Sequence, residues 1–160
     1  MLVLLLGLAI VLLDQFTKHW IRSTFVYGES RPVIDGFFNL TYVRNDGAAW
    51  NILSGHGIIL ILISVVVLVL LLIYRRSFLQ EQLSHKILLG LMVGGIVGNL
   101  IDRIRFGWVT DFLDFQFGTY HYPSFNIADS SICIAVVFYI VLNLHEERKK
   151  KAGSGAPEDG

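Results

Sequence analysis

The stretch GIILILISVVVLVLLLIY, residues 57–74, decides the fold class, because it consists almost entirely of isoleucine, leucine and valine and carries no charge. A transmembrane helix needs about 20 largely apolar residues to cross roughly 30 Å of hydrocarbon. Arg75 and Arg76 follow the stretch directly, as is typical of a chain that leaves a membrane. The stretch therefore predicts a membrane-spanning helix.

Three further apolar stretches lie outward from this one. The first, residues 1–13, is too short to span alone, so its helix must continue through Asp14, Lys18 and Trp20. The whole chain is 54% hydrophobic and 16% charged, which is too apolar for a soluble domain of this size. We therefore expect a mainly α membrane protein whose single domain covers residues 1–151, with spans at about 2–22, 57–74, 87–103 and 127–144.

Basic residues predict the orientation of these spans. The loop after residue 74 holds Arg75, Arg76 and Lys86, and the chain after the fourth span reads Arg148-Lys149-Lys150-Lys151. The positive-inside rule places both basic regions and both termini in the cytoplasm, and the segments 21–56 and 103–126 on the outer side. The tail, residues 152–160, is rich in Gly and acidic residues and is predicted to be disordered.

Charge and cysteine content exclude several classes of protein. The formal net charge is zero and the basic residues do not form one broad patch, so we expect no nucleic-acid partner. The single cysteine, Cys133, excludes an intramolecular disulfide and is expected to be a small buried hydrophobe. The first helix lacks a basic leading region and a small-residue cleavage site, so we expect it to be retained.

The two outer segments carry different patterns. Phe38, Leu40 and Tyr42 alternate with polar or small residues, and Asn45-Asp46-Gly47 follows as a turn signal, which predicts a small strand element. The segment 108–122 is rich in aromatic residues, as expected of a chain that lies in the membrane interface or lines an apolar groove.

Polar residues near the outer ends of the spans are candidates for function, because they are costly in hydrocarbon. In the third span, glycines recur every four residues at Gly90, Gly94 and Gly98, which allows a neighbouring helix to approach closely. One turn further, the same helix carries Asn99, Asp102 and Arg103. The sequence leaves open whether the acid and the base form a structural ion pair or take part in chemistry.

Two acids stand in apolar surroundings on the outer side. Asp111 lies between aliphatic and aromatic residues, and Asp129 opens the fourth span. Two desolvated carboxyl groups held close together share one proton, and can then activate water and protonate a leaving amine. Asn126 and Asp129 also have the spacing of a helix-capping pair, and spacing alone does not prove that Asp111 and Asp129 meet.

Other chemistries fit the sequence less well. A zinc peptidase would show His-Glu-x-x-His, whereas His145-Glu146-Glu147 continues with Arg148 and Lys149. No Gly-x-Ser-x-Gly element supports serine catalysis. A small transporter, a lipid-head-group transferase in which Asp111 and Asp114 share Mg²⁺, and a purely structural membrane protein are the alternatives.

Five motifs in order cover nearly the whole chain. They are Asp14-Gln15-x-Thr17-Lys18, Asn45-x-Gly47-Ala48-Ala49-Trp50, Gly94-Gly95-x-x-Gly98-Asn99-x-x-Asp102-Arg103, Val109-x-Asp111-Phe112 and Phe125-Asn126-Ile127-Ala128-Asp129. In these motifs the chain resembles the type II signal peptidases, the bacterial enzymes that process prolipoproteins. The departures, Thr110 in place of a Val and Trp50-Asn51 in place of Phe-Ser, affect no catalytic position.

The resemblance implies an aspartic endopeptidase without metal or cofactor. It implies cleavage of a diacylglyceryl-modified prolipoprotein immediately before its lipidated cysteine, in contact with membrane lipid, at the outer face of a bacterial cytoplasmic (inner) membrane. It also implies a small sheet and an interfacial helix above four transmembrane helices. The implied catalytic residues are Asp111 and Asp129. The residues implied to support the site or contact substrate are Asp14, Asn45, Gly47, Asn99, Asp102, Arg103, Asn126 and Ala128.

Overall fold

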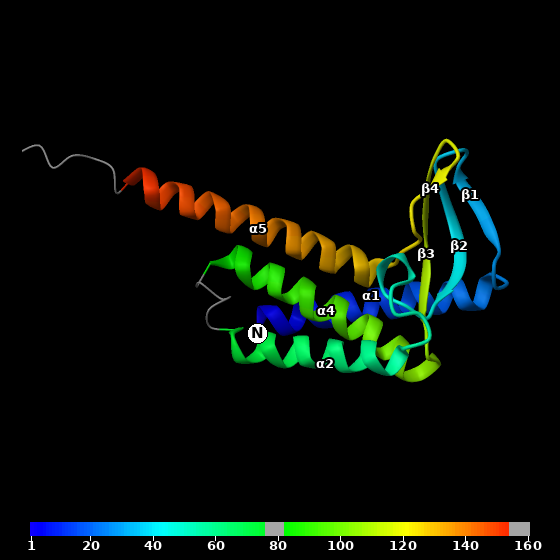
Figure 1. Ribbon diagram of the computed structural model, residues 1–160, viewed down its shortest axis with the longest axis horizontal. Helices are drawn as coiled ribbons and strands as arrows, with labels where there is room; N and C mark the ends of the chain where they lie inside the picture. Colours follow the sequence, from blue (N-terminus) through cyan, green and yellow to red (C-terminus); the bar gives the residue numbers. More distant parts are fainter. Residues whose placement is uncertain (76–81, 154–160) are drawn as a thin grey trace, which may run out of the picture.

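The computed structural model describes residues 1–75 and 82–153 as a bundle of apolar helices with a small sheet at one end (Figure 1). Arg76 of the predicted basic loop lies outside the described residues, as does the predicted disordered tail from residue 154 onward. The first two residues assigned to that tail, Ala152 and Gly153, continue the last helix.

The α-helices of the described residues lie alongside one another in the bundle (Figure 1). They are α1 (Leu2–Thr24), α2 (Gly57–Ile73), α4 (Leu83–Phe106) and α5 (Ile127–Gly153). The central helix is α4, which contacts each of the other three. Of the described helices, α1, α4 and α5 are long and apolar enough to cross a membrane, whereas α2 is a shorter apolar helix of 17 residues.

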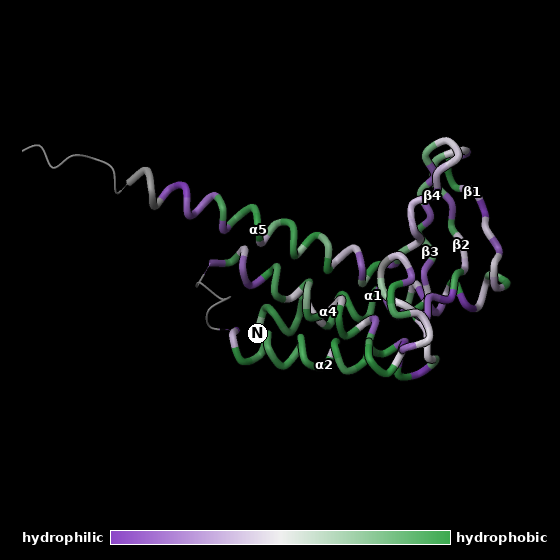
Figure 2. The backbone as a smooth tube through the Cα atoms, in the orientation of Figure 1, coloured by the Kyte–Doolittle hydropathy of each residue, from purple (hydrophilic) through white to green (hydrophobic). Residues whose placement is uncertain are grey.

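The outer surfaces of the helices are apolar, which is the reverse of a soluble bundle. In the most apolar 18-residue window of α1 and of α5, only 17% of the residues are buried inside the protein, against 44% in α4. Leu4, Leu8 and Phe16 of α1 are all more than half exposed. Figure 2 shows the hydrophobic colour along the helices and the hydrophilic colour gathered in the sheet and at the far end of α5. This distribution is that of a multi-pass membrane protein.

Glycines allow α4 to pack closely against two helices. A Cβ atom at Gly94 would lie 2.7 Å from the Gly7 carbonyl oxygen of α1, and one at Gly95 would lie 2.5 Å from the Ala128 carbonyl oxygen of α5. A Cβ at Gly98 would lie 2.7 Å from a carboxylate oxygen of Asp14. The packing role predicted for Gly94 and Gly98 is therefore confirmed, Gly95 shares it, and the close packing brings three helices together beside Asp14.

The sheet is antiparallel, in the order β1-β2-β3-β4, and stands at the end of the bundle opposite the N-terminus (Figure 1). Its strands are β1 (Ser30–Ile34), β2 (Phe38–Asn45), β3 (Val109–Phe117) and β4 (Tyr120–His121). The predicted strand is part of β2. Most of the aromatic segment 108–122, for which no strand was predicted, forms β3 and β4.

An irregularity in strand pairing lies beside one of the candidate acids. Leu40 pairs with Leu113, but the next recorded pair is Val43 with Asp111, so β2 contains one residue more than β3 in this interval. Such bulges bend a strand and redirect side chains. The bulge is therefore placed where it affects the direction of Asp111.

A buried cluster joins the sheet to the helices. Ile21 and Phe25, at the end of α1, pack with Tyr42 of β2 and Phe112 of β3. The position of the sheet is thus coupled to α1 through apolar contact. Between β2 and α2 the chain forms the short 3₁₀ turn η1 (Ala49–Asn51), and the described residues contain no other helix outside the bundle that would match the expected interfacial helix.

Candidate active site

Asp111 points from β3 toward two amide side chains. Its Oδ1 accepts a hydrogen bond from Asn126 Nδ2 at 2.7 Å, and its Oδ2 accepts one from Asn45 Nδ2 at 2.9 Å. The side chain of Asp111 is almost fully buried, with 2% of its residue surface exposed. Both carboxyl oxygens therefore have fixed directions in a site shielded from water.

Asp129 belongs to the first turn of α5 and takes part in the predicted capping pair. The backbone N–H of Asp129 donates to Asn126 Oδ1 at 2.9 Å, and the backbone N–H of Asn126 donates to Asp129 Oδ2 at 3.3 Å. This reciprocal arrangement satisfies free N–H groups at the helix start. Because Asn126 also donates to Asp111, the helix cap links the two acids, so capping and a shared site are compatible.

The surroundings of Asp111 favour its protonated form. Burial raises the pKa of Asp111 to about 7, and the nearby Asp129 carboxylate adds to this effect. The hydrogen bonds from Asn45 and Asn126, together with the charge of Lys18, act in the opposite direction. A proton is therefore available on Asp111 near neutral pH.

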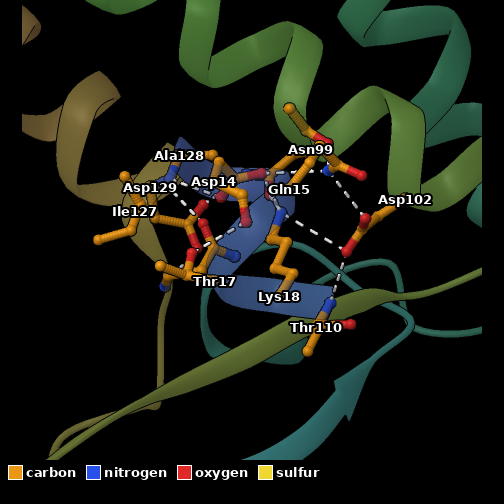
Figure 3. A network of polar contacts seen from close by, with 12 residues as sticks. Asp14, Gln15, Thr17, Lys18, Asn99, Asp102, Thr110, Ile127, Ala128 and Asp129 are labelled. Atoms are coloured by element: carbon orange, nitrogen blue, oxygen red, sulfur yellow. Dashed lines mark hydrogen bonds and ion pairs between the residues drawn. The ribbon is translucent and has the colours of Figure 1, made fainter. Parts of the chain in front are cut away.

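A buried lysine reaches Asp129 through an amide. Lys18 Nζ donates to Asn99 Oδ1 at 2.8 Å, and Asn99 Nδ2 donates to Asp129 Oδ1 at 2.7 Å. These residues come from three helices, and their side chains converge in Figure 3. Since the Asn99 oxygen is occupied by the ammonium group, its NH₂ group must face Asp129.

Asp14 holds the start of α5 in place. Its Oδ1 accepts a hydrogen bond from the backbone N–H of Ala128 at 3.0 Å, and its Oδ2 lies 2.8 Å from Lys18 Nζ. Asp14 and Lys18, one helical turn apart, form an i,i+4 ion pair in which both side chains have 0% exposure. Ala128 is likewise fully buried, directly before Asp129.

Asp102 connects α4 to the strand that carries Asp111. Its Oδ2 accepts the backbone N–H of Thr110 at 3.0 Å, one residue before Asp111. The cations nearest to Asp102 are Lys18 at 3.5 Å and Arg22 at 3.6 Å, both from α1. The sequence left open whether Asp102 forms a structural ion pair or takes part in chemistry. Asp102 does form ion pairs, but with Lys18 and Arg22 of α1 and not with Arg103.

Arg103 reaches the turn after β2. Its Nη2 donates to the Gly47 carbonyl oxygen at 2.9 Å, and the Gly47 N–H donates to Asn45 Oδ1 at 2.9 Å. Asn45 thus uses its oxygen to fix the turn and its NH₂ group to bind Asp111. Arg103 Nε is buried without a hydrogen-bond partner among the described residues. Its Nη1 makes no hydrogen bond to them either, and since Arg103 lines the cavity, this group is a donor for another molecule.

Both candidate acids line one large cavity of about 960 Å³. Arg103 and Asn45 also line the cavity. The aromatic side chains of Trp50, Tyr122 and Phe125 form part of its wall. A mainly apolar cavity with a few convergent polar groups is the usual form of a binding site. Its size and lining suit an apolar chain that brings a polar bond to the acids.

The surroundings of two residues differ from those expected from the sequence. Cys133 is exposed and lines the cavity, so the expectation of a small buried hydrophobe was wrong. Asp114 points away from Asp111: Asn39 Nδ2 donates to it at 3.1 Å, and His121 Nδ1 lies 3.2 Å from its oxygens. Asp111 and Asp114 therefore do not share a site as the magnesium alternative required.

Two supporting residues were not predicted from the sequence. Lys18 was noted only as a residue of the first span and of its motif, and no function was assigned to Gln15. Gln15 Nε2 lies 3.2 Å from Asp14 Oδ2 and 3.0 Å from Asp102 Oδ1, so it links two buried acids. The available signal was the presence of strongly polar residues inside a membrane helix.

Comparisons of this chain with known proteins all lead to the same family. The sequence profile of the signal peptidase (SPase) II family matches residues 6–145. A lipoprotein signal peptidase of Syntrophus aciditrophicus is 44% identical over 146 residues, covering 88% of this chain and 91% of that protein. One of Bacillus pumilus is 42% identical over 147 residues, covering 92% and 95%. A bacterial membrane enzyme solved by the in meso method at 2.3 Å resolution superposes with a TM-score of 0.85 at 38% identity, over 93% of this chain and 90% of that one.

Proposed function

The chain belongs to the signal peptidase II family, and we propose that it removes the signal peptide from diacylglyceryl-modified prolipoproteins as an aspartic endopeptidase. The observation that carries this proposal is the link through Asn126, which bonds to Asp111 and Asp129 on one cavity wall. Two carboxyl groups in such a position can share a proton, as aspartic peptidases require. The bond cleaved is the peptide bond immediately before the lipidated cysteine.

The two acids have different roles in this proposal. The carboxylate of Asp129 accepts hydrogen bonds from the Asn99 amide and from the backbone N–H of Asn126, and both bonds stabilise its charged form. Asp129 therefore takes a proton from the attacking water. Asp111, with its raised pKa, gives its proton to the carbonyl oxygen as the water oxygen bonds to the carbonyl carbon, which forms a diol. When the C–N bond breaks, the proton on Asp129 passes to the leaving amine and Asp111 takes back a proton from the diol, so the pair again holds one proton. The water oxygen becomes part of the new carboxyl group of the signal peptide, and the amine stays with the lipidated cysteine.

The charges around the site support one shared proton. Among the described residues, four carboxyl groups meet three cations here, namely Asp14, Asp102, Asp111 and Asp129 against Lys18, Arg22 and Arg103. A buried cluster with an unbalanced charge is strongly unfavourable. One proton on the pair of acids makes the cluster neutral, which is the protonation state that the mechanism uses.

Other polar groups at the cavity position the substrate. The free donor on Arg103 is suited to a backbone carbonyl oxygen of the signal peptide, since guanidinium groups donate in fixed directions. Asn45 keeps the Asp111 carboxyl group oriented while the Gly47 turn forms one side of the cavity. The aromatic wall accommodates the apolar signal helix and its lipid.

We also propose that α2 is a fourth membrane span and that the site faces outward. The 17 residues of α2 give a length of about 26 Å, which suffices for a fourth span. The end of α2, the start of α4 and the far end of α5 lie opposite the sheet (Figure 1). The basic residues Arg75, Lys86 and Arg148 lie at these helix ends, so both termini face the cytoplasm. The sheet and the site then face outward from a bacterial inner membrane, where prolipoproteins arrive.

The test is cleavage of a diacylglyceryl-modified prolipoprotein by the purified chain in detergent containing EDTA. Asp111→Asn and Asp129→Asn are expected to be folded and to lose at least about 1,000-fold in rate, because each removes one member of the acid pair. Asp114→Asn is the matched control, since this acid lies on the same strand but away from the cavity. Full activity in either pair variant, or inactivation of wild type by EDTA, would contradict the proposal.

A further inference from the structure

Five arginines lie at the sheet end of the bundle, and two of them have no acidic partner. Arg22 pairs with Asp102, Arg31 lies 2.7 Å from Glu29, and Arg103 faces the acids of the site. For Arg44 and Arg105, no carboxylate oxygen of the described residues lies within 4.0 Å. Their charges are therefore available to a partner from outside the protein.

Aromatic rings hold these two arginines along one surface. Arg105 Cζ lies 5.2 Å from the centre of the Phe106 ring, which lies 5.9 Å from the Trp108 ring. Arg44 Cζ lies 4.7 Å from the Trp108 ring and 4.8 Å from the Tyr27 ring. We call the set of Arg105, Phe106, Trp108, Arg44 and Tyr27 the arginine–aromatic strip.

The strip is fixed in place and open on one side. The Arg44 Nε–H donates to Tyr42 Oη at 3.1 Å, while both Arg44 and Arg105 are exposed. Cation–π contact restrains the direction of a guanidinium group without neutralising its charge. The terminal N–H groups of both arginines make no hydrogen bond to the described residues, so they are available to an acceptor.

The strip lies where an apolar span ends. It begins at the last turn of α4, beside Ile104, which is 65% exposed and belongs to the lipid-facing surface. Tyrosine and tryptophan collect at the headgroup level of a bilayer, and arginine extends its charged end to the same level. Most of the strip also lies outside the cavity of the candidate active site, of whose wall only Arg44 is a part.

We propose that the arginine–aromatic strip binds the phosphate group of an anionic membrane lipid. The guanidinium geometry matches phosphate oxygens, and the rings face the upper part of the acyl region. The inference rests on the proposed function only for placing the sheet end at a membrane surface. A lipid held there stabilises the end of β2, one residue before Asn45, which bonds to Asp111.

The test measures lipid binding without reference to cleavage. The purified chain in neutral detergent is titrated with phosphatidylglycerol or with phosphatidylcholine of the same acyl chains, and bound lipid is counted by native mass spectrometry. Wild type is expected to prefer phosphatidylglycerol. Arg44→Gln and Arg105→Gln should each weaken this binding about fivefold, since an arginine near an anionic lipid contributes about that factor.

The matched control is Arg31→Gln, which also removes one positive charge from the sheet end, but from an arginine that is already paired with Glu29. It should leave phosphatidylglycerol binding unchanged. Equal loss in Arg31→Gln, no preference for phosphatidylglycerol, or full displacement of the lipid by inorganic phosphate would each overturn the proposal. Melting in lipid-free detergent shows that each variant is folded, and a failed lipid test leaves the acid-pair test unaffected.

Discussion

The ammonium nitrogen of Lys18 lies 2.8 Å from the side-chain oxygen of Asn99, and both residues are buried: Lys18 has 0% of its surface exposed and Asn99 has 6%. The contact fixes which end of the Asn99 amide faces Asp129. A charge buried on α1 is therefore connected to an acid on α5 through a single amide on α4.

The first prediction concerns Lys18→Met. Without the lysine, the buried carboxylates of Asp14 and Asp102 lose the positive charge that they share. We therefore expect the free energy of unfolding to fall by about 3–5 kcal/mol. The double variant Lys18→Met, Asp14→Asn restores the charge balance, and the Asn oxygen can still accept the Ala128 N–H. Its stability should largely recover in thermal unfolding, whereas cleavage should stay at least about tenfold slower because Asn99 is no longer oriented. Full recovery of both would show that Lys18 acts on stability alone.

The second prediction concerns the pH dependence of cleavage. The pKa of Asp111 is about 7, so raising the pH above this value removes the proton that the mechanism needs, and kcat/KM should fall about tenfold per pH unit. In Asn45→Ala, Asp111 loses a hydrogen bond that stabilises its charged form, so its pKa rises and the fall should begin at a higher pH. A profile measured from pH 5 to 9 with Asp114→Asn as control checks this, and an unshifted fall in Asn45→Ala would contradict it.

A third prediction links the same acid to stability. The pKa of Asp111 is raised from 3.8, so its protonated form is favoured on folding; this contribution is present below about pH 4 and is lost as the pH rises through about 7. The total is about 4 kcal/mol, from 1.36 kcal/mol per pKa unit. Asp111→Asn does not titrate, so its stability relative to wild type should improve by that order between pH 4 and pH 8. Chemical unfolding at both values measures the difference, and a constant difference would refute the shift.

The positions of the helices could be predicted from the sequence because hydropathy along a membrane span is a one-dimensional signal. The predicted spans 57–74 and 127–144 begin at the observed first residues of α2 and α5. The predicted third span, about 87–103, lies within the longer helix α4 (Leu83–Phe106). Its ends carry His85, Lys86 and Arg105, which lowered the local hydropathy although the hydrogen-bonded helix continues through them.

Contacts across the bundle could be predicted only in part. The strand β3 was missed because polar and apolar residues fall on both faces of Val109 to Phe115, so the segment does not alternate as Phe38 to Tyr42 does. The exposure of Cys133 was missed because α5 is apolar all round, so no periodicity distinguishes its cavity face from its lipid face. Full burial of Lys18 depends on acids of α4 and on the packing of three helices, which its spacing from Asp14 does not reveal.

The fourth prediction uses Cys133, which lies four residues after Asp129 on the same helix and lines the same cavity. A bulky apolar maleimide attached to its thiol should occupy the cavity and reduce cleavage at least about tenfold. Cys133→Ala, which leaves no cysteine in the chain, should be insensitive to the reagent. Excess lipid-modified prolipoprotein should slow the labelling of wild type. Labelling that leaves cleavage intact would mean that the substrate does not use this cavity.

The fifth prediction separates packing at the site from packing elsewhere in the bundle. A Cβ at Gly95 would meet the Ala128 carbonyl oxygen at 2.5 Å and Ile132 Cγ1 at 2.7 Å, so Gly95→Ala must push α5 away from α4 beside Asp129. A Cβ at Gly90 would meet Leu6 Cβ at 2.9 Å, near the opposite end of the bundle. Each substitution should destabilise the fold by about 1–3 kcal/mol, as overpacking does.

The two glycine variants should differ in cleavage although they are similar in stability. Gly95→Ala shifts the first turn of α5, so the Asn99 to Asp129 hydrogen bond of 2.7 Å lengthens and the acid pair loses its alignment. We expect its kcat to fall at least about 100-fold, because a displacement of about 1 Å at a catalytic group costs that much. Gly90→Ala should keep its kcat within a few-fold of wild type at a temperature where both variants are folded. Equal losses in the two variants would mean that activity follows overall stability and not the position of Asp129.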